Sequence, residues 1–376
     1  MDILADLNPA QREAVEAPDL PVLVVAGAGS GKTRVLTHRI AYLIGERDVS
    51  PFGILAITFT NKAASEMRGR VGELVGPVAD RMWVSTFHSA CARLLRREAG
   101  ALGLKSSFSI YDQSDAIRLV DSIRKEMDLD PKRFPARGLH NRISGWKNEL
   151  VAPASAGDQA IAPIDRKAAE VFARYQQRLT AANALDFDDL LTRTVELFRN
   201  HPAVLEHWQR RFEHVLVDEF QDTNAAQWEI VRLLADDHHR VMAVGDADQS
   251  IYKFRGADYR NLLRFEESFP EAEVIVLEQN YRSTQKILDA ANAVISNNPA
   301  FRPKRLWTAR GDGEQIIRYF AEDERDEATW IIGQIDQLVD RADARYSEIA
   351  VFYRTNAQSR VLEEALVRSG VPYRVV

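Results

Sequence analysis

The segment AGAGSGKT at residues 26–33 constrains the fold of this chain more than any other stretch. It follows the apolar run VLVVA and precedes RVLTHRIAYLI, which has helical spacing, so it has the strand–loop–helix setting of a phosphate-binding loop. Its glycines let backbone N–H groups approach phosphate oxygens, and the start of the helix adds a positive dipole end. The strict pattern has glycine where this chain has Ala26, a small departure because GSGKT is intact. The segment predicts a nucleotide-binding α/β fold.

Lys32 and Thr33 close this loop, and a second segment supplies the acidic residues that such a loop needs. We expect Lys32 to reach the β- and γ-phosphates and the Thr33 hydroxyl to bind Mg²⁺. In VLVDEFQD at 215–222, Asp218 ends an apolar run and is expected to hold the same metal, while Glu219 can orient and deprotonate an attacking water. An acidic pair alone would equally suit a helix cap. Beside a phosphate loop it predicts an NTPase.

Apolar runs that suit buried parallel strands recur along the chain, and most precede helical patterns. They are residues 22–26, 54–58, 82–86, 214–219, 241–246, 274–278, 316–320 and 349–354. This alternation predicts parallel sheets covered by helices on both faces. Residues 110–185 break the rhythm, because they are mainly helical in pattern and contain no convincing strand. We therefore expect a first α/β domain at 1–109 and 186–272, a helical subdomain inserted at 110–185, and the start of a second α/β domain at 273–376.

Composition narrows the class of protein. The 376 residues are 45% hydrophobic and 28% charged, as in ordinary soluble globular proteins, and no run approaches the roughly 18 apolar residues of a membrane span. The N-terminus is acidic and polar, unlike a secretory signal, and a single cysteine fits a reducing cytoplasm. A net charge of −6 argues against a general polyanion binder but leaves room for a local basic track. His and Cys residues do not stand at zinc-ligand spacing, so we expect no zinc.

Further polar and aromatic residues follow the predicted strands. They are Phe59, Asn61 and Lys62 after the run at 54–58, His88 after the run at 82–86, and Tyr281 and Arg282 after the run at 274–278. The first group suits stacking and phosphate contact. Upstream of the phosphate loop, Gln11 lies beside an expected helix start, where its amide could read the edge of an adenine ring. An exposed helix residue is the alternative interpretation of Gln11.

The segment VGDADQSIYKFRGAD at 244–258 places Gln249 just after an apolar strand, with two aromatic residues beyond it. Tyr252 and Phe254 are two residues apart, so an extended chain would point both rings the same way. Polar residues flank them on both sides, which favours exposed rings over core rings. The segment is therefore a candidate link between a nucleotide site and a second ligand.

Taken in order and spacing, these segments resemble the motifs of the UvrD/Rep/PcrA-like superfamily-one DNA helicases. The resemblance covers nearly the whole chain, and it rests on residues 7–15, 26–33, 57–64, 83–88, 215–222, 244–257, 277–284 and 349–366. It implies two RecA-like domains, each carrying an insertion, with ATP in the cleft between them and single-stranded DNA across the top. It also implies movement 3′ to 5′ along the bound strand, in DNA repair or replication.

The same resemblance assigns roles to residues of the nucleotide site. It implies that Gln11 reads adenine and Tyr281 stacks on it, and that Gln249 and Arg282 touch the γ-phosphate. Lys32, Thr33 and Asp218 would hold MgATP, and Glu219 would activate water. The implied nucleotide-binding set is Gln11, Ala26, Gly27, Ala28, Gly29, Ser30, Gly31, Lys32, Thr33, Arg34, Tyr281 and Arg282.

The expected DNA contacts combine stacking rings with polar groups. Stacking of a base on an aromatic ring contributes about 1–3 kcal/mol and tolerates any sequence, which suits a motor on arbitrary DNA. The candidates are Phe59, Tyr252 and Phe254 for stacking, and Asn61, Lys62, His88 and Arg255 for the backbone. Many relatives carry Trp at the position of Phe254. We expect single-stranded DNA and single-strand/duplex junctions as ligands, with DNA-repair proteins as further partners.

A basic stretch at 131–149, with Phe134 and Trp146 interleaved, suits either nucleic-acid phosphate or a solvated helix face. The later motifs of the helicase family do not appear in these 376 residues. We therefore expect a truncated, N-terminal part of such a helicase that binds ATP and DNA weakly and unwinds poorly alone.

Three alternatives remain open. They are the motor part of a helicase–nuclease, a non-motor DNA-binding regulator, and a P-loop small-molecule kinase. The intact residues Lys32, Asp218, Glu219 and Gln249 argue against the regulator. The kinase would leave the segments at 57–64 and 244–257 without a role.

Overall fold

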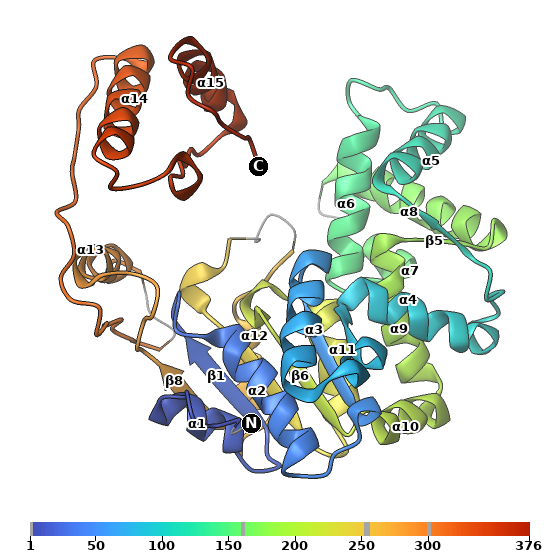
Figure 1. The fold of residues 1–376 in the computed structure, drawn as a ribbon. Coiled ribbons are helices and arrows are strands. Elements are labelled where there is room, and N and C mark those ends of the chain that lie inside the picture. Colours follow the sequence, from blue (N-terminus) through green and yellow to red (C-terminus); the bar gives the residue numbers. More distant parts are fainter. Residues whose placement is uncertain (1–2, 159–161, 252–255, 299–301) are drawn as a thin grey trace. The chain divides into compact units, whose positions relative to one another are not determined.

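A computed structural model describes residues 3–158, 162–251, 256–298 and 302–376. The chain divides into two compact units, Met1–Gly313 and Glu314–Val376. Figure 1 shows the course of the chain through both. Among the described residues, no helix is both long and apolar enough to cross a bilayer.

The first unit is built on a six-stranded sheet with the order β3-β2-β6-β7-β1-β8, in which all neighbouring strands are parallel. The strands are β1 (Val22–Ala26), β2 (Ile54–Thr58), β3 (Trp83–Thr86), β6 (His214–Val217), β7 (Val241–Gly245) and β8 (Glu273–Leu277). Runs of buried valine, isoleucine and leucine suit strands that are covered on both faces. The phosphate loop, the acidic pair and Gln249 follow neighbouring strands, so they meet at one edge of the sheet.

Helices cover both faces of this sheet, and alternate residues of each strand point into different cores. Val22 and Val24 of β1 join one core, whereas Leu23 and Val25 join the other. The first core is covered by α1 (Pro9–Glu16), α2 (Lys32–Gly45) and α3 (Asn61–Val75). The second is covered by α4 (Phe87–Arg97), α9 (Phe187–Asn200), α10 (Pro202–Arg211), α11 (Ala225–Ala235) and α12 (Asn261–Ser268). Cys91 is buried in the second core, and this burial raises the pKa of its thiol to about 12.

A helical subdomain with its own hydrophobic core interrupts the first unit. It consists of α5 (Gln113–Glu126), α6 (Ala136–Asn148), α7 (Pro153–Ala156) and α8 (Pro163–Ala181). Two short parallel strands, β4 (Ser109–Tyr111) and β5 (Ala184–Asp186), pair where the chain enters and leaves it. We expected no strand within 110–185. Strands of three residues are too short to give a recognisable alternation of apolar and polar residues.

Strand β8 is the edge strand of the first sheet, where it pairs with β1 from Val22–Glu273 to Ala26–Leu277. We expected this run to open the sheet of a second domain. An apolar run indicates a strand but not the sheet in which it pairs, so this part of the expectation differs from the structure. Helix α13 (Gln285–Ile295) follows, and the first compact unit extends to Gly313.

The second unit contains α14 (Glu324–Asp340) and α15 (Ser359–Arg368) around a small core of Ile332, Ile335 and Val371. The runs at 316–320 and 349–354, which we expected to be strands, are not strands in the structure. Phe320 is 76% exposed and Phe352 is 93% exposed. A strand needs hydrogen-bonded neighbours, and an isolated pair of strands is marginal in water.

Short 3₁₀ turns connect several of these elements. They are η1 (Pro51–Gly53), η2 (Pro77–Arg81), η3 (Ala99–Leu102), η4 (Phe220–Asp222), η5 (Ala247–Gln249), η7 (Tyr346–Glu348) and η8 (Asn356–Gln358). Turns η4 and η5 matter for function, because they carry the residues that follow β6 and β7 towards the phosphate loop.

Candidate nucleotide site and DNA groove

The phosphate loop has the backbone shape that its glycines allow. Gly29 has φ 67° and Gly31 has φ 92°, both in the left-handed region that favours glycine. A Cβ atom at residue 29 would lie 2.7 Å from Asn280 Nδ2, and one at residue 31 would lie 2.6 Å from Gln11 Nε2. Helix α2 begins at Lys32 without a side-chain cap, so the N–H groups of its first turn face the loop. The loop therefore fits a phosphate group.

Lys32 contacts two other predicted catalytic residues, Glu219 and Gln249. Its Nζ donates to Glu219 Oε2 at 2.9 Å and to Gln249 Oε1 at 3.2 Å. These partners follow β6 and β7, so the contact joins the ends of neighbouring strands to the start of α2. The Lys32 side chain is 10% exposed, which strengthens these interactions relative to a surface pair.

Thr33 and Asp218 lie beside this contact. The Thr33 hydroxyl donates to Asp218 Oδ2 at 3.5 Å, a long hydrogen bond. Burial and the neighbouring charge of Glu219 raise the pKa of Asp218 to about 6, although Lys32 partly offsets them. A hydroxyl and a carboxylate are oxygen ligands of the kind that Mg²⁺ prefers. The side chains therefore fit the expected metal.

Gln11 lies directly against the phosphate loop. Asn8 caps helix α1 by accepting from Gln11 N at 2.8 Å, and Gln11 Oε1 accepts from Asn8 N at 3.2 Å. The Gln11 Nε2 group donates to the Ser30 carbonyl at 2.8 Å, and its side chain is buried. Ser30 is also buried, and its hydroxyl donates to the Gly27 carbonyl at 2.7 Å. These bonds hold the loop against the start of the chain.

The segment after β8 packs on the other side of the loop. Asn280 Nδ2 donates to the Ala28 carbonyl at 2.5 Å, and Tyr281 N donates to the Gly29 carbonyl at 2.9 Å. The Tyr281 hydroxyl accepts from Asn8 Nδ2 at 2.8 Å, while the ring is 44% exposed beside α1. The structure thus brings Tyr281 and Gln11 together beside the phosphate loop.

The two predicted arginines are placed differently. Arg282 is exposed, and its Cβ lies so close to the loop that a Cβ at residue 29 would be 2.8 Å away. Arg34 is on the first turn of α2, where its guanidinium lies 3.7 Å from Asp6 in an exposed ion pair. Arg282 therefore lies beside the loop, whereas Arg34 has an acidic partner on the surface.

Three residues of the site were not predicted from the sequence. Asn280 holds the loop as described, and its Oδ1 accepts from the backbone N–H groups of Arg282 and Ser283. Gln221 links Glu219, through a hydrogen bond of 2.9 Å, to the backbone of Asp246 at 2.9 Å. Asn8 was missed although an asparagine before a proline and a helical run is a recognisable cap signal. Single amide residues within motifs carry no comparable signal.

A groove of about 680 Å³ lies between the sheet and the inserted subdomain. Thr58, Phe59, Phe87 and His88 line it from the strand ends. The rest of the lining is mostly polar and consists of Gln113, His140, Asn141, Ser144, Gly145, Asn148, Asp188, Asp222, Asn224, Gln227 and Gly256. Two of the predicted DNA residues, Phe59 and His88, therefore face one groove. Burial lowers the pKa of His88, and its ring packs edge-on to Phe187 at 5.9 Å.

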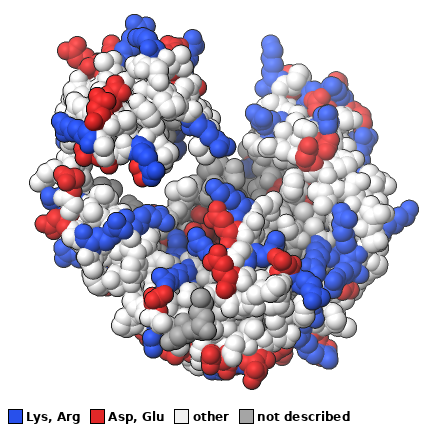
Figure 2. All heavy atoms as spheres, viewed as in Figure 1, with Lys and Arg blue, Asp and Glu red and all other residues white. Residues whose placement is uncertain are grey.

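The other predicted DNA residues lie elsewhere. Asn61 and Lys62 are exposed at the start of α3, which Thr60 caps. Tyr252, Phe254 and Arg255 lie outside the described residues. Phe134 and Trp146 of the basic stretch are buried in the core of the inserted subdomain, so they are not stacking surfaces. On the face drawn in Figure 2, basic side chains are interspersed with acidic ones.

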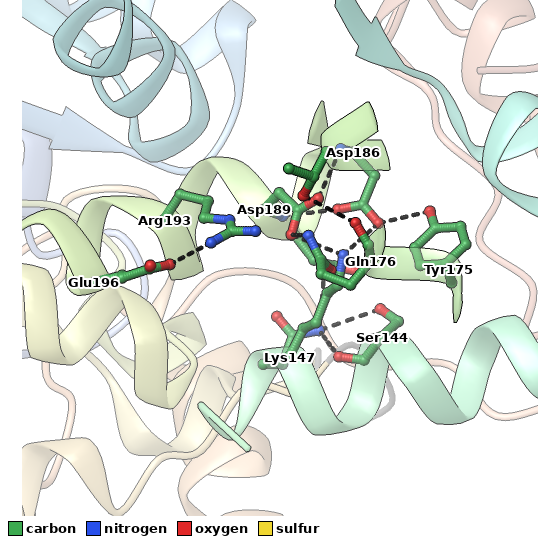
Figure 3. Close-up of polar contacts among 11 residues, drawn as sticks. Ser144, Lys147, Tyr175, Gln176, Asp186, Asp189, Arg193 and Glu196 are labelled. Atoms are coloured by element: carbon green, nitrogen blue, oxygen red, sulfur yellow. Dashed lines mark hydrogen bonds and ion pairs between the residues drawn. The ribbon is translucent and has the colours of Figure 1, made fainter. Parts of the chain in front are cut away.

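A buried ionic cluster joins the inserted subdomain to helix α9 (Figure 3). Lys147 Nζ lies 2.7 Å from Asp186 Oδ2 and 2.8 Å from Asp189 Oδ1. The Tyr175 hydroxyl donates to the same Asp186 oxygen at 2.7 Å, and Gln176 Nε2 donates to Asp189 at 3.1 Å. Lys147 directly precedes Asn148, so the cluster fixes the part of α6 that lines the groove.

The sheet order, the loop and the residues around Lys32 define a RecA-like P-loop fold with an inserted helical subdomain. The chain belongs to the UvrD/REP helicase family: the pattern of the UvrD/REP helicase N-terminal domain matches residues 7–270, and that of the UvrD-like helicase C-terminal domain matches residues 275–376. The second match begins within β8, although this strand pairs in the first sheet.

Curated relatives align over the whole chain. It is 50% identical over 374 residues to the ATP-dependent DNA helicase PcrA of Bacillus subtilis, covering 100% of this chain and 51% of the relative. It is 53% identical over 389 residues to the ATP-dependent DNA helicase UvrD1 of Mycobacterium tuberculosis, covering 100% of this chain and 50% of the relative. The chain thus spans about half the length of the curated relatives it matches.

Proposed function

We propose that this chain is an ATP-hydrolysing motor that moves 3′ to 5′ on single-stranded DNA and serves duplex unwinding in DNA repair or replication. The observation that carries the proposal is the contact of Lys32 with Glu219 and Gln249. It joins a phosphate loop, an acidic group and an amide that follows a neighbouring strand. The relatives, which are named ATP-dependent DNA helicases, support the same function.

Each residue of the site has a chemical task in this proposal. Lys32, Thr33 and Asp218 would hold MgATP, and the bound Mg²⁺ would neutralise charge that develops on the phosphates. Glu219 accepts hydrogen bonds from Lys32 and Gln221, which hold its carboxylate where a water can be oriented and deprotonated. Gln249 and Arg282 would contact the γ-phosphate, Gln11 would read adenine, and Tyr281 would stack on it.

The groove at Phe59 and His88 would hold single-stranded DNA. The position of Asp222 supports this part of the proposal. Asp222 lies three residues after Glu219 and lines the same groove. Burial and the charge of Glu219 raise the pKa of Asp222 to about 6. The segment at 219–224 therefore runs from the nucleotide site to the groove, a short path for coupling. Asn61, Lys62, Tyr252, Phe254 and Arg255 would complete the DNA track.

Single-strand/duplex junctions and DNA-repair proteins would be the further partners, and the cytoplasm would be the compartment. Cys91, the single cysteine, suits such a reducing environment. We also propose that these 376 residues unwind duplexes poorly alone.

The ATPase rate of the full chain, with and without single-stranded DNA, tests the proposal. We expect DNA to stimulate hydrolysis, and we expect Lys32→Ala and Gln249→Ala each to abolish the stimulation. Lys167→Ala is the control, because Lys167 forms only an exposed pair with Glu170. A rate that DNA leaves unchanged in the wild-type chain would contradict the motor function.

A further inference from the structure

A segment far along the chain from the phosphate loop is anchored beside it. Residues 304–307, here called the strap, run next to the continuation of β8. Asn280 N donates to the Trp307 carbonyl at 2.7 Å, and Trp307 N donates to the Glu278 carbonyl at 3.2 Å. Leu306 N donates to Asn292 Oδ1 at 3.1 Å. The strap is therefore held by backbone hydrogen bonds to Glu278 and Asn280 and by the side chain of Asn292.

The strap presents two side chains to the nucleotide site. The Leu306 side chain packs directly on Gly27 of the phosphate loop, so that a Cβ at residue 27 would overlap it. Lys304 is 6% exposed, and its Nζ lies 2.6 Å from Asp246 Oδ1 and in contact with Asp248. A buried ammonium with two carboxylate partners is costly to form unless its geometry is well defined.

Asp246 is the point where Lys304 meets the predicted catalytic residues. Its Oδ2 accepts from Gln249 Nε2 at 2.5 Å, while Gln249 Oε1 accepts from Lys32 Nζ at 3.2 Å. An amide has a donor end and an acceptor end, so these two contacts determine which way the Gln249 side chain faces. The resulting order is ammonium, carboxylate, amide and ammonium, from Lys304 to Lys32.

We propose that Lys304 is a positioning residue for nucleotide hydrolysis, which holds Asp246 so that Gln249 presents its carbonyl oxygen towards the phosphate loop. The inference rests on the proposed function of Gln249. Without the ammonium group, the carboxylates of Asp246 and Asp248 would repel each other in a buried place, and Gln249 would lose its fixed hydrogen-bond acceptor. Burial alone would lower the pKa of Lys304, but the hydrogen bonds to Asp246 and Asp248 outweigh burial and raise it.

Lys304→Met removes the charge and keeps most of the side-chain volume, whereas Lys304→Arg keeps the charge. Lys286→Met is the matched control, because Lys286 is on nearby α13 and its ammonium group donates to the Gly313 carbonyl at 2.9 Å, with no carboxylate partner among the described residues. We expect Lys304→Met to lower the DNA-stimulated kcat at least tenfold while the KM for ATP changes less than about threefold. Lys304→Arg should recover much of kcat, and Lys286→Met should match the wild type.

Two further measurements separate positioning from a general structural role. Adding Lys304→Met to Gln249→Ala should not lower the kcat measured without DNA below that of Gln249→Ala, because both changes act through one side chain. Amide hydrogen exchange in residues 241–251 should be faster in Lys304→Met than in Lys286→Met, and Lys304→Arg should restore it. This readout does not need ATP hydrolysis, so it tests the inference even if the wild-type chain is inactive.

Unchanged kcat and unchanged exchange in Lys304→Met would overturn the inference. An additive loss in the double variant, or a loss that Lys304→Arg fails to rescue in both readouts, would also overturn it. An inactive wild-type chain whose exchange follows the expected pattern would instead count against the proposed function and leave the positioning of Gln249 supported.

Discussion

The side chains of Asn148 and Asn224 are joined by a hydrogen bond of 2.5 Å, from Asn224 Nδ2 to Asn148 Oδ1. Asn148 ends α6 of the inserted subdomain, and Asn224 caps α11, which follows the acidic pair. The bond therefore connects a wall of the groove to the segment that leaves Glu219. Asn148 also donates to the Ser144 carbonyl at 2.8 Å, which keeps its amide in place.

Asn148→Ala should weaken the response to DNA. The change removes the bond to Asn224 and a polar group from the groove, while the phosphate loop keeps its contacts. We expect a several-fold rise in the DNA concentration that gives half-maximal ATPase stimulation, with basal ATPase unchanged. Gln177→Ala, at an exposed position on α8 that does not line the groove, serves for comparison. If Asn148→Ala changed only the response to ATP and not the response to DNA, the proposed connection between Asn148 and the DNA groove would be refuted.

Lys147→Met should destabilise the protein strongly. It leaves Asp186 and Asp189 buried without their cation, a situation that costs about 3–5 kcal/mol. Urea denaturation followed by circular dichroism measures the loss. Lys167→Met, which breaks an exposed pair, should cost no more than about 1 kcal/mol. Equal losses of unfolding free energy in Lys147→Met and Lys167→Met would show that the buried cluster stabilises the fold no more than an exposed ion pair does.

Gly29→Ala should impair nucleotide binding more than folding. The residue has φ 67°, and its Cβ would lie 2.7 Å from Asn280 Nδ2 and 2.8 Å from Arg282 Cβ. Gly69→Ala is the control, since a Cβ there meets nothing within 4 Å inside helix α3, and it should stabilise by about 0.5–1 kcal/mol. Titration with a fluorescent ATP analogue measures nucleotide binding in the two variants. Wild-type affinity in Gly29→Ala would mean that the loop tolerates a different backbone shape.

His214 should make stability depend on pH. Burial lowers the pKa of His214 from 6.5 to about 4, and the nearby Asp19 only partly opposes this. The unfolded chain therefore takes up a proton at a higher pH than the folded chain, so the His214 contribution is complete above pH 6.5 and falls as the pH drops towards 4. Compared with His214→Asn, the wild type should lose up to about 3 kcal/mol more between pH 7.5 and 4.5.

The comparison with His214→Asn is needed because other groups act in the opposite direction. Burial raises the pKa of both Asp188 and Asp218 to about 6, which favours the folded state as the pH falls. These carboxyl groups are present in both proteins and cancel in the difference between the two stability curves. Parallel curves for wild type and variant would contradict the lowered pKa of His214.

The meeting of the phosphate loop, Lys32 and the acidic pair could be predicted from the sequence because the signals for it are local. The glycines of the loop, Lys32 and the acidic pair each follow an apolar run, and parallel strands bring such positions to one sheet edge. Lys304 and Asn280 could not be found in this way. Their roles depend on contacts across 58 and 252 positions of the chain, and neither residue type is unusual in its segment.

Parts of the fold could also not be predicted from the sequence. The run in β8 is apolar enough for a strand, but nothing in it shows that β1 is its partner. The aromatic residues Phe134 and Trp146 stand among basic residues and suggested a nucleic-acid surface. Trp146 of α6 instead packs into the core of the inserted subdomain, and Phe134, which precedes this helix, is buried in the same core. Composition along a helix does not separate these outcomes, because both faces contribute to it.

Cys91 has a practical consequence for studying this chain. It is the single thiol of the sequence, it is buried, and its pKa of about 12 keeps it protonated at neutral pH. A thiolate is the species that reacts with maleimides, so Cys91 should remain unlabelled in the folded protein. A cysteine introduced at an exposed position such as Lys62 can then carry a single fluorophore, without first removing the native one.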